Sequence, residues 1–164
     1  MVRALPPGQQ NESLIWTCME EFNKEYAKTW NIETSLYSGV SDMLDLVHTR
    51  GLKMAIFSNK PREFTQYCVD AYLSEWNFEV VLGFDGSIPH KPDPTGALAI
   101  ARQIGIAPSS FIYLGDTGVD MQTAYAAGMY PVGALWGFRS SDELTENGAK
   151  ALVHHPSEVM GLCK

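Results

Sequence analysis

Short apolar runs alternate with segments of helical periodicity along most of the chain. The apolar runs predict buried strands at Lys53–Phe57, Phe78–Leu82, Phe111–Leu114 and Tyr130–Leu135. The segments between them repeat apolar residues every three or four positions and predict helices at Val40–Arg50, Pro61–Leu73, Thr95–Ile104 and Val119–Ala127. Strands that alternate with helices of about ten residues are typical of a parallel sheet with right-handed crossovers. The pattern therefore predicts an α/β fold, with these strands in one parallel sheet, from about Ser38 onward.

The two ends of the chain depart from this alternation. A helix is predicted from the capping residue Asn11 to Thr29, with an apolar face formed by Ile15, Cys18, Met19, Phe22 and Tyr26. Ser38-Gly39 marks a boundary, so residues 1–37 are predicted to be a helical appendage and residues 38–164 the α/β core. The C-terminal end is predicted to add a short helix, a short strand and a closing helix, at Asp142–Asn147, Ala151–Val153 and Pro156–Leu162.

Composition narrows the class of protein. A chain of 164 residues with 45% hydrophobic residues suits one domain of ordinary size with a real core. The net charge of −7, without a basic cluster, argues against a nucleic-acid surface. No apolar run is long enough to span a bilayer, and no secretory signal is present. The three cysteines are widely spaced and lack a CxxC pair, which indicates a reducing, cytoplasmic setting.

Two carboxylates stand where a predicted strand meets a predicted helix. Asp116 follows the run at Phe111–Leu114, and Asp120 falls in the first turn of the next helix. Ligands of open α/β sheets bind outside the carboxyl ends of the strands, and two nearby carboxylates repel each other unless a cation or proton lies between them. Hard oxygen ligands at this spacing suit Mg²⁺. The alternative is structural: Asp116 as a turn residue and Asp120 as a helix cap.

Two further loops at the same predicted edge carry polar groups. Ser58 offers a hydroxyl beside the backbone N–H groups of a helix start, which is an anion site or a simple N-cap. Lys91 offers a cation in a loop stiffened by Pro92 and Pro94, although a lone loop lysine is usually exposed. A donor, a cation and metal-binding carboxylates are the parts needed around a phosphoryl group.

The order and spacing of these three loops resemble a known family. Ser58-Asn59-Lys60-Pro61, His90-Lys91-Pro92-Asp93-Pro94 and Gly115-Asp116-Thr117-Gly118-Val119-Asp120-Met121 look like the second, third and fourth motifs of the haloacid dehalogenase (HAD) superfamily. The similarity extends over essentially the whole chain and is nearest to the phosphoglycolate-phosphatase-like group with a helical cap. It implies a Rossmann-like parallel sheet with helices on both faces. It also implies that residues 1–37 are the later part of the cap that closes over the substrate.

The resemblance assigns roles to particular residues. It implies that Ser58, Asn59 and Lys91 bind the phosphoryl group, with Ser58 and Lys91 acting in catalysis. Asp116 would coordinate Mg²⁺, and Asp120 would support the metal directly or through water. The substrate would be a small phosphorylated metabolite, hydrolysed through an aspartyl-phosphate.

The chain departs from the family pattern at the first motif. That motif, a strand ending in Asp-x-Asp-Gly-Thr, supplies the nucleophile and the general acid/base upstream of the cap. The nearest match, Gly83-Phe84-Asp85-Gly86-Ser87, follows the wrong strand and has glycine at the nucleophile's place, so we reject it. We interpret Met1 as falling inside the cap, which fits a truncated chain, an internal start or a late start assignment. The missing strand would be central, between Lys53–Phe57 and Phe111–Leu114, and its absence would leave two unpaired strand edges.

Four other residues are weaker candidates for substrate contact. His90, next to Lys91, could touch the substrate. Trp136 and Phe138 could wall the site or belong to the core, and Arg139 could meet a substrate carboxylate. Two functional classes follow for the chain as a whole. One is a Mg²⁺-dependent phosphomonoesterase whose nucleophile lies upstream; the other is a non-catalytic remnant that binds phosphate or a partner through the same loops.

Overall fold

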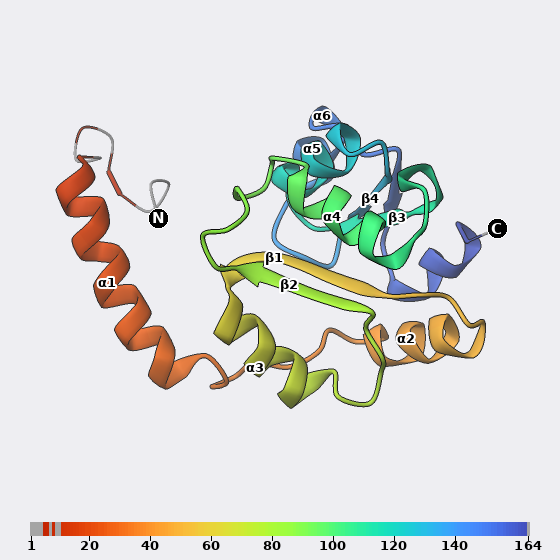
Figure 1. The fold of residues 1–164 in the computed structure, drawn as a ribbon, viewed down its shortest axis with the longest axis horizontal. Coiled ribbons are helices and arrows are strands. Elements are labelled where there is room, and N and C mark those ends of the chain that lie inside the picture. Colours follow the sequence, from red (N-terminus) through yellow and green to blue (C-terminus); the bar gives the residue numbers. More distant parts are fainter. Residues whose placement is uncertain (1–4, 7, 9–10, 164) are drawn as a thin grey trace. The chain divides into compact units, whose positions relative to one another are not determined.

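The chain divides into two compact units. The computed structural model describes residues 5–6, 8 and 11–163 (Figure 1). One unit is Met1–Thr34 and the other is Ser35–Lys164, so the division lies close to the boundary predicted after residue 37. None of the helices in the described ranges is long and apolar enough to cross a membrane.

Among its described residues, the first unit contains one helix. α1 spans Glu12–Thr29, and the Asn11 side chain caps it by accepting a hydrogen bond of 2.9 Å from the Leu14 N–H. This is the helix that the capping residue and the apolar repeat predicted. None of its residues is buried, and Trp16 and Phe22 are 67% and 52% exposed.

The second unit is an α/β core, which confirms the predicted fold class. Its helices are α2 (Val40–Thr49), α3 (Arg62–Tyr72), α4 (Thr95–Ile104), α5 (Gly118–Ala126) and α6 (Ser141–Glu146). Its strands are β1 (Ala55–Pro61), β2 (Val80–Phe84), β3 (Ile112–Gly115), β4 (Tyr130–Ala134) and β5 (Ala151–Val153). The closing helix predicted at Pro156–Leu162 is a 3₁₀ helix over Pro156–Gly161, with i to i+3 bonds such as Leu162 N–H to the Val159 carbonyl.

The strands form two sheets, so the prediction of one sheet was wrong. β1 pairs with β2, and β3, β4 and β5 form a separate sheet in that order. The β1–β2 and β3–β4 pairs are parallel, as predicted, with Ala55 opposite Val80 and Ile112 opposite Tyr130, and the β4–β5 pair is parallel too, with Val132 opposite Ala151. The break falls between β1 and β3, the two strands that the sequence indicated as neighbours of a missing central strand.

Helices on both faces hold the two sheets in one unit without a ladder between them. One buried cluster joins α2 to both sheets, through Met54 just ahead of β1 and Val132 of β4. A second cluster consists of alanines and a methionine from α4, α5 and the turn after α5, and both Phe57 of β1 and Tyr113 of β3 pack against it. In Figure 1, α4 lies on one side of the β1–β2 pair and α3 on the other. β1 and β3 are thereby packed against the same two helices, α4 and α5.

Candidate active site

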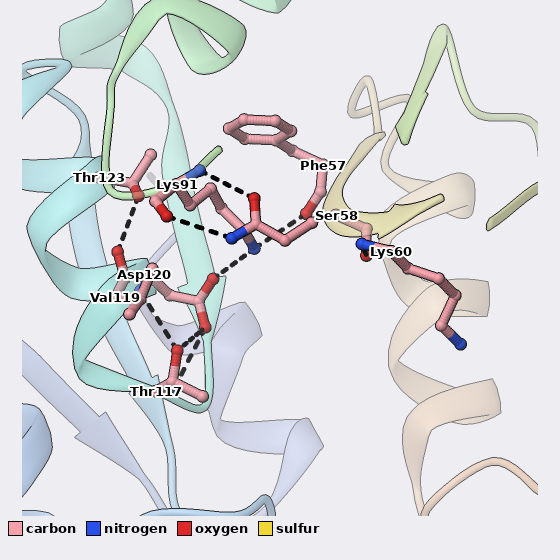
Figure 2. A network of polar contacts seen from close by, with 9 residues as sticks. Phe57, Ser58, Lys60, Lys91, Thr117, Val119, Asp120 and Thr123 are labelled. Atoms are coloured by element: carbon pink, nitrogen blue, oxygen red, sulfur yellow. Dashed lines mark hydrogen bonds and ion pairs between the residues drawn. The ribbon is translucent and has the colours of Figure 1, made fainter. Parts of the chain in front are cut away.

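A buried ion pair lies between β1 and the start of α5. The Lys91 ammonium and the Asp120 carboxylate are 2.6 Å apart, and their side chains are only 12% and 9% exposed (Figure 2). Lys91 Nζ also donates a hydrogen bond of 3.2 Å to the carbonyl oxygen of Phe57 in β1. One ammonium group therefore links β1 of the first sheet to the helix that follows β3. The alternative of a solvent-exposed loop lysine is wrong, because the Lys91 side chain is largely buried and paired with Asp120.

The side-chain amide of Asn59 makes two hydrogen bonds to the backbone of Lys91. Its side-chain oxygen accepts a hydrogen bond of 2.8 Å from the Lys91 N–H, and its side-chain nitrogen donates one of 3.1 Å to the Lys91 carbonyl. The Lys91–Pro92 peptide bond is cis. The amide of Asn59 thus fixes the point from which the lysine side chain extends. Contact of Asn59 with phosphate stays a prediction, and an amide nitrogen carries a second N–H that could make it.

These two hydrogen bonds should contribute measurably to the stability of the fold. Replacing Asn59 by Ala is expected to lower the free energy of unfolding by about 2 kcal/mol, because it leaves a backbone N–H and a carbonyl of a part-buried loop without partners. Asn59→Asp keeps the acceptor for the N–H but loses the donor, so it should fall below wild type as well. Urea unfolding followed by circular dichroism measures both values. An Asn59→Ala protein as stable as wild type would contradict a stabilising role for these two hydrogen bonds.

Asp120 is held by the start of α5 as well as by Lys91. Its second oxygen accepts hydrogen bonds from the Thr117 N–H at 3.2 Å and from the Thr117 hydroxyl at 2.7 Å. Thr117 in turn caps α5 by accepting from the Asp120 N–H, which completes a capping box. The carboxylate is stabilised there by the N-terminal end of the helix dipole. The interpretation of Asp120 as a helix-capping residue is confirmed, and the same carboxylate also forms the ion pair with Lys91.

Asp116 lies at the end of β3 and faces the turn after β4. One of its oxygens accepts a hydrogen bond of 3.1 Å from the Phe138 N–H. A Cβ at Gly137 would collide with the Asp116 side chain, so glycine is required for this close approach. Unlike Asp120, Asp116 is bonded here only to a main-chain donor in the contacts recorded for the described residues.

The carboxylates fit a magnesium ion only in part. Among the described residues, no group of three or more histidine, cysteine, aspartate or glutamate side chains is placed to hold a metal ion. Asp116 has the hard oxygen atoms that Mg²⁺ prefers, whereas both oxygens of Asp120 already accept hydrogen bonds from Lys91 and Thr117. Any ion here would need further oxygen ligands from water or substrate. The metal roles predicted for Asp116 and Asp120 stay predictions.

Ser58 lies in a strand and not at a helix start. β1 runs through Ser58 to Pro61, and α3 begins only at Arg62, with Pro61 as an N-cap that makes no side-chain cap bond. The N-cap alternative is therefore wrong, because the strand continues four residues past its predicted end at Phe57. The Ser58 hydroxyl accepts a hydrogen bond of 3.1 Å from the Lys60 N–H. Its phosphate contact stays a prediction.

The weaker candidates separate into packed and exposed residues. Trp136 packs against the cluster that joins α2 to the sheets, which favours the core interpretation, whereas Phe138 is 81% exposed beside Asp116. His90 stacks on the Phe84 ring with centroids 3.6 Å apart, and Arg139 lies 3.7 Å from the Glu143 carboxylate. Only Phe138 is both exposed and bonded to a candidate residue.

Sequence reasoning missed Tyr113, which lies inside β3. Its hydroxyl is buried and has no hydrogen-bond partner among the residues that the structure describes. Burial raises the pKa of Tyr113 well above its ordinary value, and the negative charge of Asp120 raises it further. Nothing distinguishes this tyrosine in the sequence from an ordinary aromatic residue of a buried strand.

Removing this hydroxyl should stabilise the protein. Tyr113→Phe is expected to raise the free energy of unfolding by about 1 kcal/mol, because a buried polar group without a partner carries its full desolvation cost. Tyr125, which is 68% exposed, provides the control, and Tyr125→Phe should leave stability unchanged. Paired denaturant titrations test both. A loss of stability in Tyr113→Phe would show that the hydroxyl is hydrogen-bonded.

Comparison with known proteins decides the family. A model of the haloacid dehalogenase-like hydrolase family matches residues 1–134. The chain belongs to this family. It is 34% identical over 140 residues to a phosphoglycolate phosphatase of Xanthomonas campestris pv. campestris (strain 8004), which covers 85% of this chain and 63% of that protein. It is 32% identical over 123 residues to the Escherichia coli (strain K12) phosphoglycolate phosphatase, covering 75% of this chain and 49% of that one.

A solved structure shows the same backbone arrangement. It comes from Lactobacillus delbrueckii subsp. bulgaricus, its assignment as a phosphoglycolate phosphatase is provisional, and it matches with a TM-score of 0.89 and 28% identity. The match covers 97% of this chain and 66% of that chain. The predicted family and fold are confirmed. The chain spans less than two thirds of the length of these relatives.

Proposed function

We propose that this chain carries the phosphate-binding half of a Mg²⁺-dependent phosphomonoester hydrolase of the phosphoglycolate-phosphatase type. The observation that carries the proposal is the buried Lys91 ammonium between β1 and the start of α5, the helix that follows β3. An ammonium has three donors, and two of them bond to Phe57 and Asp120, which leaves a third for a phosphoryl oxygen. A fixed cation in a part-buried site stabilises the charge of a transferring phosphoryl group more than an exposed one does.

Each residue of the site has a role in this proposal. Asn59 fixes the position of the Lys91 backbone, and the ion pair with Asp120 fixes the position of the Lys91 ammonium. Ser58 offers a hydroxyl to a phosphoryl oxygen, and Asp116 offers a carboxylate oxygen to Mg²⁺. A magnesium ion, when bound, neutralises phosphate charge and orients the phosphoryl group. The protein works on a small phosphorylated metabolite in the cytoplasm.

The nucleophile is assigned to a segment outside these 164 residues. The sequence contains no Asp-x-Asp, and Asp120 is committed to Lys91 and Thr117. Formation of an aspartyl-phosphate needs a carboxylate placed for in-line attack and an acid that protonates the leaving oxygen. We therefore expect the 164-residue chain by itself to have negligible phosphatase activity.

The test compares two chains in the same assay. One is the 164-residue chain, and the other carries ahead of residue 1 the first part of a cap and a strand ending in Asp-x-Asp-Gly-Thr. The longer chain should hydrolyse 2-phosphoglycolate or p-nitrophenyl phosphate with Mg²⁺, and EDTA should abolish the activity. Asn in place of the first Asp of that motif is the matched control and should be inactive. EDTA-sensitive turnover by the 164-residue chain, purified free of other phosphatases, would show that the nucleophile lies within it. Phosphate binding by an inactive longer chain would instead support a non-catalytic binding protein.

A further inference from the structure

The first residue of α5 is bonded to a side chain from another helix. Gly118 begins α5, and the N–H groups in the first turn of a helix have no partner within the helix. The Glu143 carboxylate of α6 accepts a hydrogen bond of 3.3 Å from the Gly118 N–H. A negative group at this position is also stabilised by the positive end of the helix dipole. Glu143 therefore bonds to the main chain two residues after Asp116 and two residues before Asp120.

The end of α6 packs against the same glycine. A Cβ at Gly118 would come within 2.6 Å of the Asn147 side-chain amide, so no larger residue fits there. Asn147 follows α6 directly, accepts a hydrogen bond from Gln122 of α5, and donates one of 2.7 Å to the Glu143 carbonyl oxygen. Figure 1 shows α5 and α6 side by side, and the two helices are in contact. Close packing and the carboxylate thus position α6 against the start of α5.

The other end of the same segment contacts Asp116. The Phe138 N–H donates its hydrogen bond of 3.1 Å to the Asp116 carboxylate, in the turn that leads from β4 to α6. Residues 137–147 therefore contact the loop 115–118 at two places, the Asp116 side chain and the Gly118 N–H. The loop lies between these two contacts, so its conformation depends on the position of one segment of the chain.

Arg139 offsets the charge of Glu143. Its Nε lies 3.7 Å from the Glu143 carboxylate, and the two side chains are 41% and 31% exposed. Glu143 is a third carboxylate at the start of α5, besides Asp116 and Asp120, and nearby carboxylates repel one another. A half-exposed ion pair contributes little to stability. What the guanidinium provides here is a compensating charge, so that Glu143 can bond to the start of α5.

We propose that Glu143 is a positioning residue, which fixes the loop 115–118 through the Gly118 N–H and thereby fixes the direction of the Asp116 carboxylate. Without the Glu143 carboxylate, the loop would keep only its contact between Asp116 and the Phe138 N–H, and the first N–H of α5 would lose its acceptor. The effect on the loop follows from these contacts alone. An effect on magnesium rests, in addition, on the proposed function.

The first test follows amide hydrogen exchange in the 164-residue chain. Glu143→Ala is expected to speed exchange at residues 118–120 about tenfold, because the first turn of α5 opens more often without this acceptor. Amides of residues 55–57 and 80–82, in the β1–β2 sheet, should be unchanged. Glu143→Gln keeps an acceptor oxygen and should restore most of the protection. Glu146→Ala, at an exposed glutamate of the same helix, is the matched control and should exchange like wild type.

The second test uses the active longer chain of the proposed function. Glu143→Ala should raise the Mg²⁺ concentration for half-maximal rate about tenfold, the scale of losing a residue that orients a metal ligand. The KM for substrate at saturating Mg²⁺ should stay within about twofold of wild type. Glu143→Gln should again lie close to wild type. A residue that only stabilised the fold would lower the amount of active enzyme and leave the half-maximal Mg²⁺ concentration unchanged.

Each result decides for or against the role of Glu143. Faster exchange confined to the start of α5, with rescue by Glu143→Gln, supports it. Unchanged exchange there, or an equal increase in the β1–β2 sheet, overturns it. An active longer chain whose half-maximal Mg²⁺ concentration is unchanged by Glu143→Ala also overturns it and leaves the proposed function standing. An inactive longer chain overturns the proposed function, and the exchange result then decides this inference. If Glu143→Ala does not fold, Glu143→Asp, whose carboxylate is one methylene further from the Gly118 N–H, carries the same expectations.

Discussion

Replacing Lys91 by Met is expected to lower the free energy of unfolding by about 3 to 5 kcal/mol. The substitution keeps the length of the side chain but removes the charge that faces Asp120, whose side chain is 9% exposed. A carboxylate left in that position has lost its cation and cannot recover full hydration. The Phe57 carbonyl loses its donor at the same time. Urea unfolding of the 164-residue chain measures the change.

Two controls separate burial from charge. Lys24 lies 2.7 Å from Glu21, almost the same distance, but both side chains are more than 60% exposed. Lys24→Met should therefore leave the unfolding midpoint unchanged, because exposed pairs are hydrated and screened. The double substitution Lys91→Met with Asp120→Asn should recover much of the loss, since no unpaired charge remains buried. If Lys91→Met proved as stable as wild type, the ion pair would be absent from the folded protein in solution.

Hydrophobic periodicity was sufficient for the elements and for the parallel pairing. α4 begins and ends at the predicted residues, Thr95 and Ile104, because a proline precedes it and a glycine follows it. β1 was predicted to end at Phe57 but runs to Pro61. The polar residues Ser58–Lys60 look like a loop, and in the structure they form an irregular stretch of β1 between the pairs Phe57–Leu82 and Pro61–Phe84. The return to pairing at Pro61 depends on the neighbouring strand, and that information does not lie in the segment itself.

The division into two sheets arises because no strand in the described residues pairs with both β1 and β3. The apolar runs that became β1 and β3 are separated by more than 50 residues, and nothing in either run shows which strand lies next to it. The expectation that a strand was missing there came from the family resemblance. Its consequence for sheet pairing, two separate sheets joined by helices on both faces, required coordinates.

The sequence predicted a set of candidate site residues but not their contacts. Lys91, Asp116 and Asp120 were identified from motif order, and the structure brings Lys91 and Asp120 into direct contact. The hydrogen bonds between the Asn59 side chain and the Lys91 backbone were not foreseen, because no sequence pattern indicates a contact between residues 32 positions apart. Tyr113 was missed for a different reason: an unpartnered hydroxyl is a property of its surroundings.

Replacing Asp116 by Asn in an active longer chain is expected to lower turnover by about 100-fold or more, the scale of losing one electrostatic stabiliser. Asn keeps an oxygen that can accept from the Phe138 N–H, so the turn after β4 should stay in place. What the substitution removes is the negative charge toward Mg²⁺. Lys91→Ala should cause a loss of similar size by removing the charge that faces the phosphoryl group. Asp142→Asn, at an exposed position of α6, is the matched control and should stay within about twofold of wild type.

The magnesium dependence identifies how Asp116 acts. If Asp116 is a metal ligand, the Mg²⁺ concentration for half-maximal rate should rise about tenfold or more in Asp116→Asn, because the ion loses a charged oxygen. The Lys91→Ala enzyme should keep its half-maximal Mg²⁺ concentration while its turnover falls. The two variants would then differ in the metal titration although both are slow. Equal Mg²⁺ dependence in Asp116→Asn and wild type would contradict a metal role, and would leave Asp116 as the residue that positions Gly137 and Phe138 beside the site.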